Sequence, residues 1–128
     1  MFSEAVLDHF RNPRNAGELA HADATVEVTN PVCGDVLKLT ARAIEGRIAE
    51  ARFQCRGCTT AIACASFLTE TIGGKASNEL RAITPDMISD AMGGLPPATF
   101  HAAQLAADAG SAMAKALDGA RARERPDA

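Results

Sequence analysis

Aromatic residues and long apolar runs are scarce in this sequence. It has no tryptophan and no tyrosine, and aromatic residues make up 4% of the chain. Its formal net charge is −3, whereas phosphate binding needs a basic surface, so we expect no nucleic-acid partner. No apolar run approaches the ~20 residues of a membrane span, and the N-terminus lacks the basic-then-apolar pattern of a signal peptide. These absences predict a cytoplasmic protein without a membrane partner.

The length and composition are typical of one globular domain. The 128 residues suffice for a hydrophobic core without disulfide bonds. Hydrophobic residues make up 47% and charged residues 23% of the sequence, and many of the hydrophobic ones are alanine. The last eight residues are rich in charge and include Pro126. We predict a single domain over residues 1–120 and a frayed charged tail over residues 121–128.

Period-two patterns predict three antiparallel strands joined by short turns. Val26 and Val28 alternate with polar residues, and residues 37–43 follow the same pattern after a turn. A turn at residues 45–47 leads to a return strand, in which Ala49, Ala51, Phe53 and Cys55 share one face. We therefore expect an antiparallel meander with one face covered.

Helical patterns account for most of the remaining chain. An N-terminal helix can be capped by Ser3, and a longer helix over residues 59–72 stops at two glycines. Short helices are expected from Ser77 and from Pro85, and an alanine-rich helix over about residues 98–120. The buried stripe predicted for this last helix is Leu105, Ala109, Ala112 and Ala116. The predicted fold class is α+β: a three-stranded antiparallel sheet packed against several helices.

Thiol, carboxylate and imidazole groups lie beside glycine or proline in three predicted loops. Cys33 and Asp35 share a tight turn, in which Gly34 gives the backbone freedom. Cys58 precedes the helix at residues 59–72, where unpaired backbone N–H groups favour a thiolate. His101 begins the last helix, after Leu95-Pro96-Pro97. In a reducing cytosol the four cysteines are better interpreted as free, metal-bound or catalytic thiols than as disulfides, so these loops could converge on a soft metal.

Each of these residues also has an ordinary structural interpretation. Cys33 could be a small apolar turn residue, and His101 a polar residue at a helix end. Cys64 lies about 600° of helical rotation beyond Cys58, which favours a packed core residue. Cys55 completes a Cys-x-x-Cys motif, typical of a redox pair or half a zinc site, yet strand alternation turns it inward. His9 and His21 are interpreted as surface or loop residues.

Four blocks of the sequence resemble the scaffold proteins of iron–sulfur cluster assembly, the family containing IscU, SufU and the N-terminal domain of NifU. The blocks are residues 9–17, 30–35, 53–66 and 95–101, so the resemblance covers nearly the whole chain. It implies an IscU/NifU-like fold in which Cys33, Asp35 and Cys58 are cluster or metal ligands. It also makes His101 a candidate fourth ligand.

The function implied by this resemblance is that of a scaffold or carrier, and not of an enzyme. Such a protein accepts sulfur from a cysteine desulfurase, builds a labile [2Fe–2S] cluster on bound iron and passes it to apo iron–sulfur acceptor proteins. Asp35 fits this role, because a carboxylate is a poorer cluster ligand than a thiolate. No nucleophile–base arrangement is visible in the sequence.

The chain also departs from the family pattern. Ala102 stands where the family has a third cysteine, and Cys55 stands where it has a small or polar residue. Two hypotheses follow: Cys55 turns into the site and replaces the missing thiol, or it is buried and the site has two thiols. Ala98 and Thr99 replace the Val-Lys of IscU-type scaffolds, so we expect no dedicated recognition by an Hsp70-type chaperone.

Two other functions fit the same residues. In the first, Cys33, Asp35, Cys58 and His101 hold zinc tetrahedrally, and one thiolate relays sulfur as a persulfide. In the second, the chain is a degenerate paralogue that has lost cluster building and acts as an interaction module.

Overall fold

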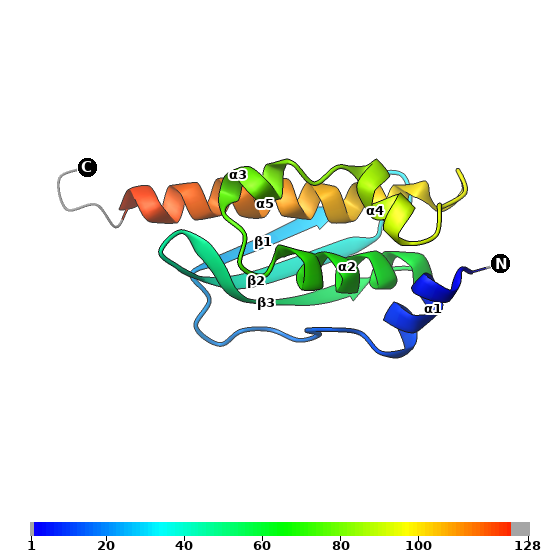
Figure 1. Ribbon diagram of the computed structural model, residues 1–128, viewed down its shortest axis with the longest axis horizontal. Helices are drawn as coiled ribbons and strands as arrows, with labels where there is room; N and C mark the ends of the chain where they lie inside the picture. Colours follow the sequence, from blue (N-terminus) through cyan, green and yellow to red (C-terminus); the bar gives the residue numbers. More distant parts are fainter. Residues whose placement is uncertain (1, 124–128) are drawn as a thin grey trace.

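A three-stranded antiparallel sheet organises the structure, a computed structural model that describes residues 2–123 (Figure 1). Its strands are β1 (Ala24–Thr29), β2 (Val36–Ile44) and β3 (Arg47–Arg56), in the order β1-β2-β3. The two residues between β2 and β3, Glu45 and Gly46, have φ angles of 53° and 78°, as a two-residue hairpin turn requires. The predicted meander is confirmed.

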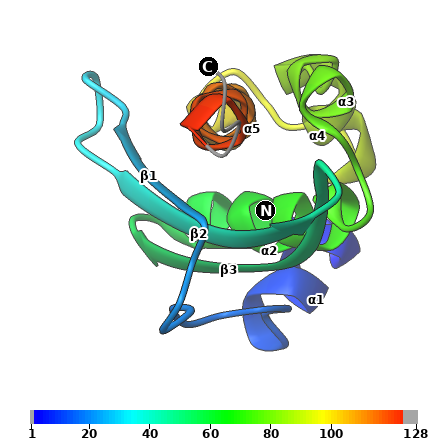
Figure 2. The ribbon, with the colours of Figure 1, turned by 90° about the vertical axis from the view of Figure 1, so that its left-hand side faces the viewer.

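Two long helices cover one face of this sheet. Helix α2 (Thr59–Ile72) packs on β3, whereas α5 (Phe100–Arg123) packs on β1 and β2 and against α2 (Figure 2). The short helices α3 (Ser77–Arg81) and α4 (Pro85–Ala91) pack against α5, and α1 (Glu4–Arg11) packs against α2. The arrangement confirms the predicted α+β fold. No helix within residues 2–123 has the length and apolar character that a membrane crossing demands.

Side-chain caps fix where three helices begin. Ser3 Oγ accepts a hydrogen bond from Val6 N at the start of α1, and Thr84 Oγ1 accepts one from Met87 N before α4. Cys58 is the N-cap of α2, and its Sγ accepts from Ala61 N at 3.4 Å. These caps satisfy backbone donors that have no partner within the helix. The predicted position of Cys58 at the helix start is confirmed.

The bounds and buried face of α5 differ from the prediction. The helix begins two residues later than expected and continues to Arg123, past the predicted end at residue 120; residues 124–128 of the predicted tail lie outside the described residues. Leu105 and Ala109 are buried as predicted. The stripe then continues through Met113 and Leu117 and not through Ala112 and Ala116, which are only partly buried. Each step of four residues turns about 40° beyond a full helical turn, so the buried face of α5 shifts around the helix axis toward its C-terminal end.

A β-bulge interrupts the alternation predicted for β3. Ala43 pairs with Ile48 and Arg42 pairs with Glu50, so Ala49 is the extra residue. Ile48 is therefore buried, whereas Ala49 is exposed and its predicted inward orientation is wrong. Beyond the bulge the alternation resumes, with Ala51 and Phe53 in the core.

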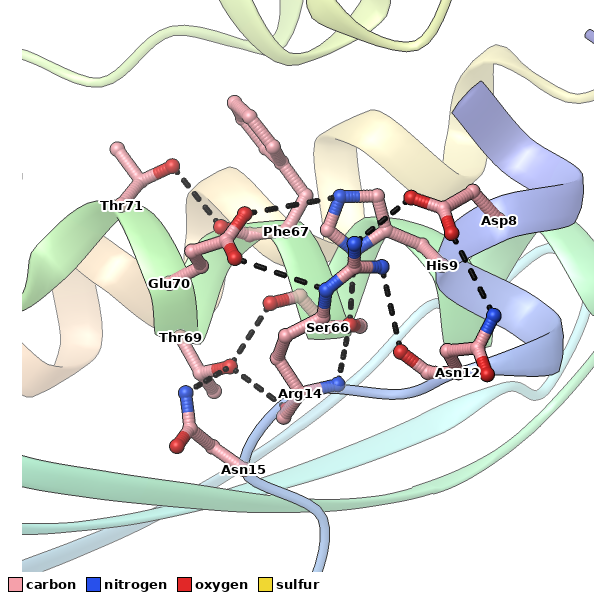
Figure 3. A network of polar contacts seen from close by, with 10 residues as sticks. All are labelled: Asp8, His9, Asn12, Arg14, Asn15, Ser66, Phe67, Thr69, Glu70 and Thr71. Atoms are coloured by element: carbon pink, nitrogen blue, oxygen red, sulfur yellow. Dashed lines mark hydrogen bonds and ion pairs between the residues drawn. The ribbon is translucent and has the colours of Figure 1, made fainter. Parts of the chain in front are cut away.

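His9 lies in a buried polar network, here called the linker clamp, formed by His9, Arg14, Ser66, Thr69 and Glu70 (Figure 3). His9 Nδ1 is 2.8 Å from Ser66 Oγ, which also accepts a hydrogen bond from Arg14 N at 2.8 Å. Thr69 Oγ1 donates to Arg14 O, and Glu70 approaches both His9 and the Arg14 guanidinium. These contacts hold the chain segment that follows α1 against α2. The surface assignment of His9 is wrong, because the residue is 6% exposed and contacts Ser66, 57 positions away in sequence. His21 is exposed as predicted.

Candidate metal centre

Three chain segments meet at one end of the sheet, on the right in Figure 1. They are the turn between β1 and β2, the junction of β3 with α2, and the start of α5. The sheet register brings the first two together, because Val36 at the start of β2 pairs with both Thr29 and Arg56. The turn at residues 30–35 therefore lies beside residues 57 and 58.

Three of the four predicted ligands converge at this end. Single ligand atoms of Cys33, Asp35 and His101 all lie within 4.8 Å of one another. His101 Nε2 is 3.8 Å from Asp35 Oδ2, and these two side chains are 25% and 13% exposed. Cys33 is exposed, so this group of three, here called the donor cluster, opens to solvent on its thiol side. Ions and exogenous ligands can therefore reach it.

Asn30 holds the turn that carries Cys33 and Asp35. Its buried side-chain oxygen accepts hydrogen bonds from Val32 N and Cys33 N at 2.9 and 3.3 Å, and its backbone N–H donates to Asp35 O. Its Nδ2 donates to His101 O at 3.5 Å, which ties the turn to α5. The role of Asn30 was not predicted, although an asparagine that opens a turn before proline is a known signal.

Gly57 lets the Asp35 carboxylate approach the backbone. A Cβ at this position would lie 2.8 Å from Asp35 Cγ and 2.9 Å from its Oδ2. Any larger residue would therefore push the carboxylate away or move the chain. Gly57 separates Cys55 from Cys58 in the chain, so Asp35 packs against the segment that joins these two thiols.

Cys58 flanks the donor cluster without belonging to it. Its exposed thiol accepts the N–H of Ala61 at the start of α2. The structure thus brings together three of the four predicted ligands, and it places the fourth one residue from the glycine that Asp35 contacts. Cys58 can join the cluster if its side chain gives up the bond to Ala61.

The donor cluster fits a metal cation. Asp35 Oδ2 is buried and has no hydrogen-bond partner among the described residues. A buried oxygen of this kind is unfavourable, because it has lost its contact with water without gaining a hydrogen bond, and His101 Nε2 at 3.8 Å is too far away to donate one. A bound cation would supply that partner. Thiolate, imidazole and carboxylate are also the ligand types that zinc and iron accept.

The other two cysteines differ in how deeply they are buried. Cys64 is fully buried in α2, as predicted, and burial raises the pKa of its thiol to about 12. Cys55 is half-buried at the end of β3. Its thiol pKa is also raised to about 12, by burial first and then by the nearby Asp35 and Cys58. Ala102 is packed in the core and offers no ligand atom.

The fold and the cysteine–aspartate–histidine cluster define a small α+β protein with a candidate metal centre at one end. A family model, NifU-like N terminal domain, matches residues 1–124. The chain belongs to this family, which confirms the resemblance seen in its sequence.

Two similar proteins are both named as iron–sulfur cluster assembly scaffolds. The iron-sulfur cluster assembly scaffold protein IscU 1 of Archaeoglobus fulgidus is 45% identical over 109 residues, which cover 85% of this chain and 71% of that protein. The scaffold protein IscU of Escherichia coli K12 is 43% identical over 112 residues, covering 84% and 87% of the two chains.

A solved structure supports the fold. The N-terminal NifU-like protein from Brucella abortus superposes with a TM-score of 0.75 at 19% identity, over 91% of this chain and 94% of the other. At this identity the likeness concerns the fold alone.

Proposed function

We propose that this protein is a scaffold on which an iron–sulfur cluster is assembled as cargo. The observation that carries the proposal is the donor cluster, in which three ligand atoms lie within 4.8 Å of one another. One of its members, Asp35, has a buried Oδ2 atom without a hydrogen-bond partner among the described residues. The proposed cargo is a labile [2Fe–2S] cluster built on bound iron. Cys33, Asp35, Cys58 and His101 are its proposed ligands. The names of the two relatives support the scaffold role.

The exposure of the thiols suits sulfur delivery. Cys58 is exposed at a helix N-terminus, so its thiolate can attack the outer sulfur of a cysteine desulfurase persulfide. The S–S bond breaks, the desulfurase thiolate leaves, and a persulfide remains on Cys58. A two-electron reductant, such as an external dithiol, then cleaves this persulfide, so that sulfide is released to the bound iron and the Cys58 thiolate is restored. Cys33 is also exposed and can bind iron at the same opening. Because Asp35 is a weaker cluster ligand than a thiolate, the cluster can pass to apo acceptor proteins. This role requires no enzymatic activity.

Anaerobic reconstitution with ferrous iron and sulfide tests the proposal. We expect the wild-type chain to acquire a visible chromophore with iron and sulfide bound in equal amounts. The Cys33→Ala variant should lose the chromophore, whereas Cys64→Ala should retain it, because Cys64 is fully buried in the hydrophobic core. A wild-type chain that stays colourless, while Ala102→Cys forms the chromophore, would refute scaffold activity for the native sequence.

The composition of the donor cluster also favours a second candidate, a zinc-bound sulfur relay. Zinc accepts cysteine, histidine and carboxylate ligands in a tetrahedral site. In that case the purified protein should be colourless and contain one zinc ion. Mixing with a desulfurase and cysteine should then add one sulfur atom to the chain, and mass spectrometry would detect it. The absence of both iron and zinc binding would leave the interaction-module interpretation.

A further inference from the structure

We propose that Cys55 supplies a third sulfur ligand to the metal, beside Cys33, Cys58 and the Asp35 oxygen, and takes the fourth position of a tetrahedral site in place of His101. The inference rests on the proposed function, since it requires that the site hold a metal. It concerns a thiol that lies outside the group of three converging ligand atoms.

The register of the sheet places Cys55 on the same face as the Asp35 carboxylate. Cys55 pairs with Leu37, and the next pair is Arg56 with Val36. One step further along both strands, Asp35 lies against Gly57, as their close contact also shows. Alternate residues of a strand share a face. Cys55 and Gly57 therefore point to one side, and the Asp35 carboxylate occupies the space on that side of Gly57.

The two thiols thus lie on either side of the glycine that Asp35 contacts. Cys55 precedes Gly57 by two residues, and Cys58 follows it directly. Asp35 Oδ2, which has no hydrogen-bond partner among the described residues, lies 2.9 Å from the point where a Cβ on Gly57 would be. A cation that satisfies this oxygen would therefore bind close to the chain segment that carries both thiols.

The burial of Cys55 fits a ligand better than it fits a core residue. Phe53, two residues earlier on the same face, is 4% exposed, and Cys64 is fully buried. Cys55 is only half-buried, because β3 ends immediately after it.

Zinc loading of the full chain tests the inference by counting sulfur atoms. The purified protein is stripped with a chelator, loaded with one equivalent of Zn²⁺, and studied by zinc X-ray absorption. We expect three sulfur ligands at about 2.3 Å in the wild-type chain and two in Cys55→Ala. The matched control is Cys64→Ala, which removes a thiol of the same region and should retain three. Competition with a chromophoric chelator should show a zinc affinity at least ~10-fold lower for Cys55→Ala, since even outer-shell changes have effects of this size.

The outcomes separate this inference from the proposed function. If wild type and Cys55→Ala have the same sulfur count and affinity, Cys55 is not a ligand, while metal binding by the site still stands. If wild type binds no zinc, or Cys33→Ala binds it as well as wild type, the metal site itself is wrong. If Cys55→Ala fails to fold, Cys55→Ser carries the same comparison, because the hydroxyl preserves the size of the side chain but cannot contribute a sulfur.

Discussion

The linker clamp and the donor cluster are two polar regions of the molecule, and they differ in whether their buried groups have hydrogen-bond partners. In the clamp, Ser66 Oγ contacts both the Arg14 N–H and the His9 ring. In the donor cluster, Asp35 Oδ2 is equally enclosed but has no hydrogen-bond partner among the described residues. Buried polar groups in native proteins are normally paired. We infer that the clamp stabilises the fold by itself, whereas the buried oxygen of the donor cluster is paired only when a cation binds.

The largest expected change in stability comes from the clamp. Ser66→Ala would leave the Arg14 N–H and His9 Nδ1 without their partner, and each unpaired buried group costs about 1–3 kcal/mol. We expect the free energy of unfolding in urea to fall by about 2–4 kcal/mol, with zinc affinity unchanged. The control is Ser77→Ala, which removes a hydroxyl bonded to the exposed Asp118 and should change stability by less than about 0.5 kcal/mol. Equal losses in the two variants would refute the structural role of the clamp.

A smaller change is expected from crowding the donor cluster. In Gly57→Ala the new Cβ would meet Asp35 Cγ at 2.8 Å and Ala61 Cβ at 3.1 Å. Overpacking of this kind costs about 1–3 kcal/mol, and the displaced carboxylate should also lower zinc affinity. Gly73→Ala is the matched control, because a Cβ there meets nothing within 4 Å. Urea unfolding and zinc titration of both variants measure the two effects, and a Gly57→Ala chain that binds zinc normally would contradict the proposed placement of Asp35.

Removal of the Asp35 carboxylate should have opposite effects on stability and on binding. Asp35→Ala deletes a buried oxygen without a partner, so the metal-free chain should become more stable by about 1 kcal/mol. Zinc affinity should fall, because a ligand is lost. Thermal unfolding with a chelator present measures the first effect, and zinc titration the second. If the metal-free variant is instead less stable than wild type, the Asp35 carboxylate stabilises the fold, as the clamp residues do.

The smallest effect is a pH dependence that originates in the clamp. Burial holds the pKa of His9 below its ordinary value of 6.5, the Arg14 charge lowers it further, and Glu70 and Asp8 partly oppose them. The unfolded chain therefore binds more protons than the folded chain as the pH falls below about 6.5. Stability should decrease through this range and level off below the folded pKa. Urea unfolding between pH 5 and 7.5 should show a steeper loss for wild type than for His9→Gln, and parallel curves would refute the assignment.

Local patterns predicted the elements of this fold, because strand alternation and helix caps are encoded by neighbouring residues. They predicted the convergence of Cys33, Asp35, Cys58 and His101, because all four lie where strands or helices meet loops. The structure brings together the ligand atoms of three of them, and Cys58 lies beside this group. The bulge at Ala49 was missed, since an extra strand residue has no distinctive composition. His9 was misplaced because its environment depends on Ser66, in a different helix. Asn30 was missed for the same reason, because its bond to His101 O joins residues 71 positions apart.

Because Asp35 Oδ2 has no hydrogen-bond partner among the described residues, the stability of the whole chain should depend on whether the site is occupied. A ligand that binds only the folded state raises its stability by mass action, by about 2.7 kcal/mol at a free concentration 100 times Kd. The melting temperature of the protein would therefore rise with loading and fall with delivery. If the cargo is an iron–sulfur cluster, each transfer to an acceptor returns the chain to its less stable form, and a thermal melt can follow that transfer without observing the cluster itself.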